Sequence, residues 1–292
     1  MGKYTRSPSH AGSWYEKDGD TLTKQIEQWM AEALVEPNIP VRAIIAPHAG
    51  YRYCGHVMAH AYKQIDPTQV SRVFLLGPSH HVYTQQCILS WADAYRTPLG
   101  DIPIDKEVTA HLQSTGMFDN MDQETDEAEH SLELHLPYIF HALRSRDFSL
   151  VPIMVGTLSA GSEEAYGKIL GPYLDDPCNF FVISSDFCHW GSRFRYTPYD
   201  PAQGPIWKFI EYMDRKGMEA IETTDASVFR SYIQKTRNTI CGRHPIGVFL
   251  NMLRHSRSKH KIEFKYYDQS SQCETKGDSS VSYAAAVATP LS

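Results

Sequence analysis

The chain has 292 residues, of which 42% are hydrophobic and 21% are charged, and its formal net charge is −6 with histidine neutral. This composition is typical of a globular protein with enough apolar side chains for a large core. The weakly acidic balance argues against a protein that binds nucleic acid or an anionic membrane surface, because such binding needs a basic surface.

Four short, continuously apolar runs predict buried strands, at 43–45, 73–76, 150–155 and 180–183. Apolar and polar residues do not alternate in these runs, which suits a sheet covered on both faces. Helical patterns lie between and after them: one capped by Asp20, one at 55–65, one at 162–174 with Ser162 as its cap, one at 205–221, and one that opens at His244 and Pro245. Two late segments, 262–267 and 281–288, are expected to be strands.

This alternation predicts one α/β domain over residues 1–292, with a largely parallel central sheet flanked by helices. No apolar run approaches the roughly 20 residues that span a bilayer, so membrane insertion is not expected. The first residues lack the apolar core of a signal peptide. We therefore expect a cytoplasmic protein, with the nucleus as an additional compartment.

Histidine is abundant, with 14 residues, and three of the apolar runs end in a polar motif that contains it. His48 follows the first run, His80 the second and His189 the fourth. In an open α/β sheet, ligands bind beyond the carboxyl ends of the strands, so these imidazoles are expected to meet at one edge. Neutral imidazole binds iron, copper and zinc. The pattern therefore predicts a metal site.

Four residues could supply an anionic ligand to this site: Asp186, Glu129, Glu133 and Cys241. The segment 129–135, which also carries two histidines, could contribute from the start of a helix. Asp186 could instead orient a ligand histidine through a hydrogen bond. We expect His81 to point away from the metal into a hydrogen bond. Seven other histidines are interpreted as structural: His10, His56, His60, His111, His141, His255 and His260.

Cys241 lies just before the helix that opens at His244. A thiol near a helix N-terminus tends to ionise, because the helix dipole and nearby positive charge stabilise thiolate. An ordinary buried thiol is the alternative. None of the six cysteines forms a C-x-x-C pair, so they are interpreted as scattered thiols rather than a disulfide scaffold.

Seven segments, from the N-terminus almost to the last residue, resemble the MEMO family (mediator of ErbB-receptor-driven cell motility). They are His10 to Tyr15, Ala46 to Tyr51, Gly77 to His81, His130 to Tyr138, Ser184 to Trp190, Thr239 to Pro245 and Asp278 to Ala285. The resemblance implies a fold similar to that of class III extradiol dioxygenases, which are non-haem Fe(II) enzymes. Those enzymes bind their metal with two His and one Glu.

By this resemblance His48 and His80 match the two histidine ligands, and His189, with Asp186 beside it, falls among the catalytic residues as an acid/base group. The third ligand position falls at Cys241, where the dioxygenases have Glu. This difference argues against ring cleavage, because thiolate is softer than carboxylate and favours copper while still accepting iron.

Three functions follow from these observations. The first, implied by the resemblance, is an iron- or copper-binding redox protein, in effect a metal-dependent oxidoreductase, with roles in intracellular signalling and cell motility and an unidentified small-molecule redox partner or substrate. The second is a non-catalytic adaptor that binds phosphotyrosine peptides in the same cleft. The third and least favoured is a zinc-dependent hydrolase that uses His48, His80 and Asp186. The expected rim of the cleft consists of Arg193, Arg195, Tyr51 and His81, although the segment 191–204 could also be a plain solvated loop.

Overall fold

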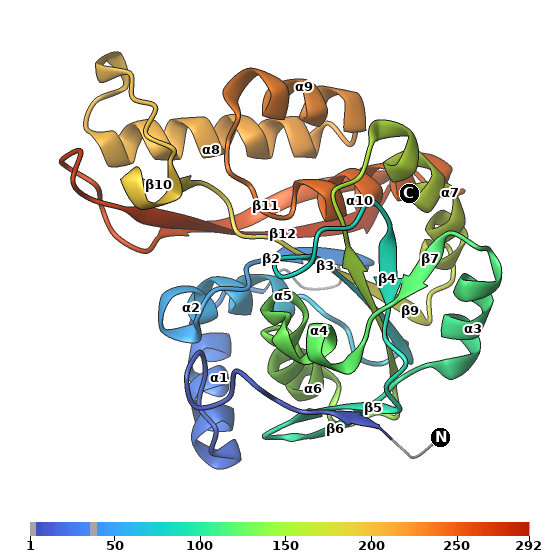
Figure 1. Cartoon of the computed structure of the whole chain (residues 1–292). Coiled ribbons are helices and arrows are strands. Elements are labelled where there is room, and N and C mark those ends of the chain that lie inside the picture. The colour runs from blue at the N-terminus through green and yellow to red at the C-terminus, as the bar shows by residue number, and fades with distance from the viewer. Residues whose placement is uncertain (1–3, 36–39, 292) are drawn as a thin grey trace.

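The computed structural model describes residues 4–35 and 40–291. Four parallel strands form the centre of its main sheet, in the order β2 (Ala43–Ala46), β9 (Asn179–Ser184), β3 (Arg72–Pro78) and β8 (Ser149–Val155) (Figure 1). They correspond to the four apolar runs of the sequence and are almost entirely buried. The predicted strands and their parallel arrangement are confirmed here.

Antiparallel pairs flank this parallel centre on both sides. β12 (Ser280–Pro290) runs antiparallel to β2, and it also pairs with β11 (His260–Gln269) and β10 (His189–Trp190). On the other side, β4 (Cys87–Leu89) is antiparallel to β8, and β7 (Phe118–Asn120) is parallel to β4. The sheet as a whole is therefore mixed. Consecutive strands such as β11 and β12 can pair antiparallel through a loop, whereas a parallel pair needs a crossover connection.

The longer helices predicted from the sequence are present: α1 (Gly19–Glu32), α2 (Tyr51–Tyr62), α7 (Ala160–Leu174), α8 (Ile206–Glu222) and α10 (Arg243–His255). Two predicted caps are wrong by a few residues. The Asp18 side chain, not that of Asp20, accepts the Thr21 N–H and caps α1, and Ser159, not Ser162, caps α7. Asp20 lies inside the first turn of α1, where the negative charge of its carboxylate interacts favourably with the helix dipole.

Several short elements had no clear signal in the sequence. They are α3 (Lys106–Ser114), α4 (Gln123–Ala128), α5 (His130–Glu133), α6 (Leu136–Leu143), α9 (Ala226–Thr236), the 3₁₀ turns η1 (Ser192–Phe194) and η2 (Pro201–Gln203), and a small second sheet of β1 (Thr5–Arg6), β5 (Ala94–Thr97) and β6 (Gly100–Pro103). Most of them lie between β3 and β8 along the chain.

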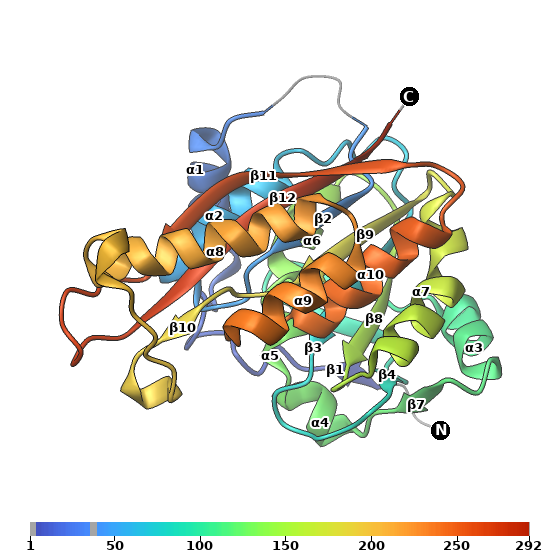
Figure 2. The same cartoon turned by 90° about the horizontal axis from the view of Figure 1, so that it is seen from above.

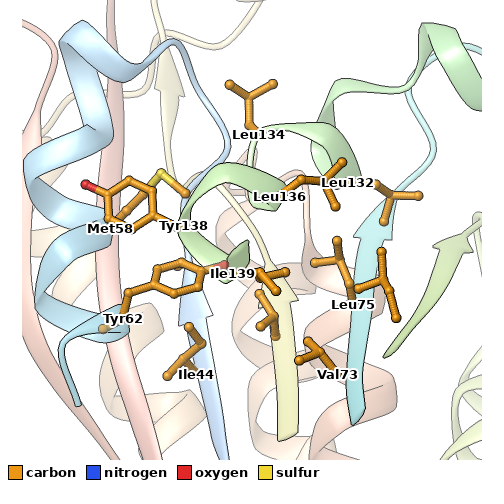
Figure 3. Close-up of a cluster of buried hydrophobic side chains, with 14 of the residues drawn as sticks. Ile44, Met58, Tyr62, Val73, Leu75, Leu132, Leu134, Leu136, Tyr138 and Ile139 are labelled. Carbon is orange, nitrogen blue, oxygen red and sulfur yellow. The ribbon is translucent and has the colours of Figure 1, made fainter. Parts of the chain in front are cut away.

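The two faces of the sheet are covered by separate groups of helices (Figure 1, Figure 2). Along β3, Val73 and Leu75 pack into one core with α1, α2 and α6, whereas Phe74 and Leu76 pack into the other with α7 and α10. Successive strand residues point to opposite faces, so a continuously apolar run serves both cores. Figure 3 shows the first core, in which Tyr62 of α2 lies among aliphatic side chains.

No helix in residues 4–35 and 40–291 combines the length and the apolarity needed to cross a membrane.

Candidate metal centre

Three donor side chains meet beyond the carboxyl ends of β2 and β3. His48 follows β2, His80 follows β3, and Cys241 precedes α10; their donor atoms all lie within 4.8 Å of one another. His48 Nε2 is 3.3 Å from Cys241 Sγ, and the two imidazole centroids are 5.2 Å apart. The structure therefore brings together the three residues that the sequence assigned to the metal.

Cys241 reaches His48 because its neighbour Gly242 has no side chain. A Cβ at Gly242 would lie 2.3 Å from Ser185 Cβ and 2.5 Å from the carbonyl oxygen of Ser184. The Gly242 N–H donates to Ser185 Oγ at 3.0 Å. The start of α10 is thus held directly against the end of β9, a close approach that only glycine permits.

Hydrogen bonds behind His48 determine which of its ring nitrogens carries the proton. The Ser184 hydroxyl donates its one hydrogen to the Ser131 carbonyl at 2.7 Å. The Ser184 oxygen can therefore only accept hydrogen bonds from its other two neighbours, His48 Nδ1 at 2.5 Å and His135 Nε2 at 2.9 Å. Both imidazoles therefore donate to Ser184, which leaves the lone pair of His48 on Nε2, the atom that faces Cys241. His135 Nδ1 in turn accepts from the Tyr62 hydroxyl at 2.8 Å.

The four side chains linked by these hydrogen bonds are all buried: His48, Ser184, His135 and Tyr62. Burial lowers the pKa of His48 well below its usual value, and it lowers the pKa of His135 to about 3. Both rings are consequently neutral across the physiological pH range. This agrees with the hydrogen bonds, which place one proton on each ring. A neutral imidazole with its lone pair directed at a thiol is suited to bind a cation.

Asp186 holds the backbone of the His48 segment. Its carboxylate accepts the His48 N–H at 2.8 Å, and burial raises its pKa to about 7. Among the described residues it belongs to no group of converging metal donors. This contact is the orienting arrangement considered from the sequence, although it reaches the backbone of His48 rather than the ring. The catalytic role of Asp186 stays a prediction.

His80 is backed by a carboxylate instead. Its Nδ1 lies 2.8 Å from Glu129 Oε1, and its backbone N–H donates to Glu129 Oε2 at 2.7 Å. Glu129 Oε1 also accepts the Ser131 N–H at 2.8 Å, so the carboxylate is itself fixed at the start of α5. Because His80 Nδ1–H donates to Glu129, its Nε2 is left for the donor set. Such a carboxylate partner is common behind metal-binding histidines.

The electrostatics of His80 differ from those of His48. Burial by itself disfavours the imidazolium, but hydrogen bonds with Cys241 and Glu129 outweigh it and raise the pKa of His80 to about 10. For Cys241, burial raises the pKa of the thiol, and the nearby His80 only partly opposes this. This direction is opposite to the one expected from the helix start. The thiolate form of Cys241 therefore depends on a positive partner beside it.

A third imidazole, His130, stacks on His80. The two ring centroids are 4.2 Å apart with an interplanar angle of 25°, and Trp14 covers the same His130 ring at 4.6 Å. Burial and the neighbouring His80 lower the pKa of His130 to about 3. With His80 and Glu129 it forms a second group of converging donors. The sequence indicated a contribution from this segment but not its stacked geometry.

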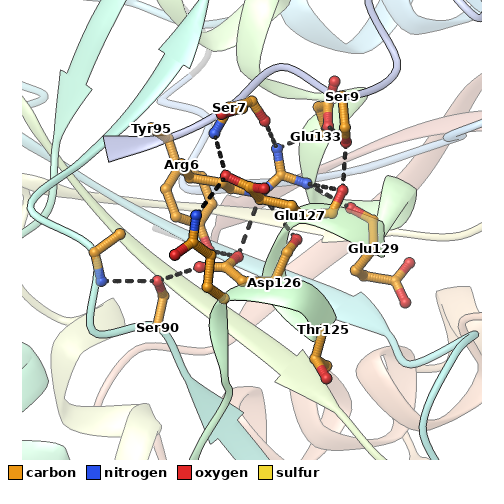
Figure 4. A network of polar contacts seen from close by, with 12 residues as sticks. Arg6, Ser7, Ser9, Ser90, Tyr95, Thr125, Asp126, Glu127, Glu129 and Glu133 are labelled. Atoms are coloured by element: carbon orange, nitrogen blue, oxygen red, sulfur yellow. Dashed lines mark hydrogen bonds and ion pairs between the residues drawn. The ribbon is translucent and has the colours of Figure 1, made fainter. Parts of the chain in front are cut away.

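Trp14 is brought to the site by an N-terminal arm, residues 5–15, which is anchored on the buried carboxylate of Glu133. This carboxylate accepts from the His10 N–H at 2.8 Å and from the Tyr15 hydroxyl at 2.8 Å, and it pairs with Arg6 Nη1 at 2.7 Å. Arg6 is also fully buried and lies 3.3 Å from Asp126 (Figure 4). His10, interpreted as structural, has this role: its ring lies 2.9 Å from Glu133.

His189 lies at the start of β10, and its Nδ1 is 2.9 Å from the carbonyl oxygen of Phe187 and 3.2 Å from that of Thr239. Two carbonyl acceptors require a proton on Nδ1, so Nε2 carries the lone pair. Burial lowers the pKa of this imidazole. Among the described residues His189 belongs to no converging donor group. Its pKa is also lowered by the charge of His80, so it lies near the donor set without being part of it.

The expected rim is found in part. Arg193 and Arg195 are exposed in and just after η1, where Arg193 stacks on Phe194 and Phe194 contacts the His189 ring, and His81 is exposed as well. Tyr51 is not on the rim. It is the first residue of α2, its side chain is buried, and its hydroxyl donates to the Leu134 carbonyl at 2.6 Å. The core below α2 takes up this aromatic ring, as it does Tyr138.

These features define the class of protein: an α/β protein with a candidate mononuclear metal centre of two imidazoles and one thiol at the carboxyl edge of a mixed sheet. The chain belongs to the Memo-like protein family, whose model matches residues 6–287. It is 54% identical over 285 residues to "Protein MEMO1" of Danio rerio, with 96% of each chain covered. It is 52% identical over 289 residues to "Protein MEMO1" of Homo sapiens, with 97% of each covered.

The search of solved structures found an uncharacterised protein of Escherichia coli K12. The two share 14% sequence identity with a TM-score of 0.48, and the match covers 84% of this chain and 99% of that one.

Proposed function

We propose that this protein binds one redox-active ion, iron or copper, with His48, His80 and Cys241, and acts as a metal-dependent redox protein. The observation that carries the proposal is the convergence of the three donor atoms within 4.8 Å. The hydrogen bonds behind both imidazoles support it, because they occupy each Nδ1 and direct each Nε2 at the donor set. His48 offers a free lone pair there, and His80 would release its Nε2 proton when the ion binds. Two imidazoles and one thiolate suit copper and also accept iron.

The bound ion would supply one-electron chemistry, and the protein's own residues would hold and orient it. Ser184 and Glu129 fix the tautomers of the two histidines. His189 carries a lone pair on Nε2 beside the donor set, so it is suited to accept a proton from a bound substrate. Cys241 would contribute one negative charge, which lowers the net charge of the loaded site.

The zinc-hydrolase alternative has less support. It requires Asp186 as the third ligand, but the Asp186 carboxylate is engaged with the His48 backbone N–H and Cys241 Sγ lies in contact with His48 Nε2. Ring cleavage of the dioxygenase kind is disfavoured because the third donor is a thiol instead of a carboxylate. The signalling and motility roles implied by the sequence resemblance are part of the proposal, and so is the cytoplasmic location expected from the first residues of the sequence.

A phosphotyrosine-peptide adaptor is the second candidate function. It is favoured by one observation: Arg193 and Arg195 are exposed next to Phe194, whose ring contacts the His189 ring 5.2 Å away. Arginine pairs bidentately with phosphate. Binding of a phosphotyrosine peptide to metal-free protein, lost when both arginines are replaced by alanine, would support this candidate.

The test of the metal proposal is anaerobic reconstitution with Fe(II) or Cu(I), followed by metal analysis and by mass-spectrometric mapping of alkylated cysteines. One equivalent of bound ion should protect Cys241 from alkylation. Cys178, the other cysteine of intermediate exposure, is an internal control whose reaction should not depend on metal. Cys241→Ser should weaken copper more than iron, because a hydroxyl cannot replace a soft thiolate. Equal alkylation of Cys241 with and without metal would exclude it as a ligand.

A further inference from the structure

Three aromatic rings form a continuous stack from a candidate ligand to the protein surface. His80 contacts His130 at a centroid distance of 4.2 Å, and His130 contacts Trp14 at 4.6 Å, with interplanar angles of 25° and 37°. Trp14 is 37% exposed. On the other side of the donor set, His48 is backed by the buried groups of Ser184, His135 and Tyr62. His80 is itself 27% exposed, and the stack adds an aromatic connection from this ligand to a second point on the surface, at Trp14.

The stack is held in place by buried charged groups that anchor the N-terminal arm. Trp14 lies on the arm whose anchor, Glu133, binds Arg6, His10 and Tyr15 in the protein interior. Burying an arginine and two carboxylates is unfavourable unless every group is paired, and here the Arg6 guanidinium contacts Glu133 and Asp126. The indole of Trp14 is therefore fixed on His130 rather than free to leave it.

From this arrangement we infer that Trp14 and His130 form the path by which single electrons pass between the bound ion and an outer-sphere redox partner at the surface. The inference rests on the proposed function and adds the route of exchange and the class of partner, a one-electron donor or acceptor that does not enter the site. In the oxidising direction the reduced ion loses one electron and the acceptor gains it. No bond forms or breaks, and no proton moves.

Stacked π systems are suited to this role because their orbitals overlap across a van der Waals contact, whereas aliphatic packing offers no such overlap. Trp91 is a matched comparison, since it is exposed to 39% and stacks on Tyr4 at 4.7 Å. Among the described ring contacts it touches no histidine of the site. Any effect of replacing a surface indole in general would therefore appear at Trp91 as well.

The experiment uses full-length protein loaded with Cu(I) or Fe(II) and mixed rapidly with a substitution-inert ruthenium(III) ammine complex as acceptor. Trp14→Leu and His130→Leu should each slow oxidation of the ion by about tenfold or more, which is the effect of a modest rise in the barrier. Trp14→Phe keeps a ring and should lie between Trp14→Leu and the wild type, and Trp91→Leu should match the wild type. Metal affinity, measured by competition with a chelator, should stay within about twofold in Trp14→Leu, Trp14→Phe and Trp91→Leu, well below a tenfold change.

The path is refuted if Trp14→Leu oxidises as fast as Trp91→Leu. It is also refuted if Trp14→Leu loses metal affinity in proportion to rate, because the stack would then only position His80. These outcomes differ from failure of the proposed function, in which the wild-type protein itself would retain no ion after reconstitution. A second readout is the fluorescence of the indole: binding of Cu(II) should quench emission in the wild type and in Trp91→Leu, and clearly less in Trp14→Leu.

Discussion

The two histidines of the candidate metal centre offer the same donor atom but are held by different surroundings. His48 is buried and backed by the neutral groups of Ser184, His135 and Tyr62, whereas His80 is partly exposed and backed by the Glu129 carboxylate. On the His48 side, a fixed set of hydrogen bonds determines a neutral tautomer. On the His80 side, charge makes the imidazole basic. The difference suggests that one side provides rigidity and the other governs competition between metal and protons.

Removal of either ligand should have the largest effect. His48→Ala and His80→Ala are both expected to abolish tight metal binding, measured as retained metal after matched reconstitution. Their stabilities should differ. His48→Ala leaves the buried Ser184 without one of its donors and opens a cavity, at a cost of about 1–3 kcal/mol. His80→Ala removes a side chain that is 27% exposed, but it leaves the buried Glu129 carboxylate without its imidazolium partner, so at neutral pH it should cost more. Equal destabilisation in chemical unfolding would contradict the comparison.

Replacement of the backing groups should separate the two sides. Glu129→Gln is expected to lower metal affinity by about 10–100-fold, because the carboxylate that increases the basicity of His80 is lost. Ser184→Ala leaves the N–H groups of His48 and His135 unpaired in the interior, so it should mainly lower the free energy of unfolding, by about 1–3 kcal/mol. The measurements are chelator competition and urea unfolding on both variants. If Ser184→Ala reduced metal affinity as much as Glu129→Gln, the hydrogen-bond partners of His48 and His80 would have the same effect on metal binding, and the comparison would fail.

The proton affinity of the two rings should differ in the metal-free protein. In NMR titrations His48 is expected to stay neutral throughout the neutral range, while His80 titrates near the value of about 10 given above. Since the pKa of His80 is raised on folding, its contribution to stability is complete below about pH 6.5 and is lost as the pH rises through about 10. Glu129→Gln should lower the pKa of His80 by about one pH unit. An unchanged titration in that variant would mean that Glu129 does not set the charge of His80.

The smallest effect is expected at the rim. Arg193→Ala and Arg195→Ala should change metal affinity by no more than about twofold, because interactions of exposed charges are weak and screened. A larger loss of affinity would indicate that these arginines contribute to the metal centre itself.

The sequence was most informative where local pattern and tertiary position coincide. Continuously apolar runs marked β2, β3, β8 and β9, and a histidine after a parallel strand must lie near its carboxyl edge, so the meeting of His48 and His80 could be foreseen. Cys241 was placed through the family resemblance. The short elements between β3 and β8 could not be predicted, because they carry little periodicity and are held by tertiary contacts such as those of Arg6 with Asp126 and Glu133.

The groups behind the ligands were missed for the same reason. Ser131 and His135 come from α5 and the turn after it. The sequence placed this segment at the start of a helix and considered it only as a source of metal ligands, so the contacts of Ser131 and His135 with Ser184 could not be foreseen. Tyr51 was expected at the rim of the cleft. The first turn of α2 rotates its side chain into the core instead, where burial of an aromatic ring is favourable.

The donors of the candidate metal centre are far apart along the chain, because His48 and Cys241 differ by 193 in residue number. During synthesis on the ribosome, the amino-terminal half of the protein can therefore expose both histidines long before the thiol emerges. A partly made chain can offer two imidazoles but not the complete site, so full-affinity loading has to follow synthesis of α10. Once bound, an ion present at 100 times its dissociation constant would add about 2.7 kcal/mol to the stability of the finished fold. Metal supply would then influence how much of the newly made protein survives quality control, as well as how much of it is active.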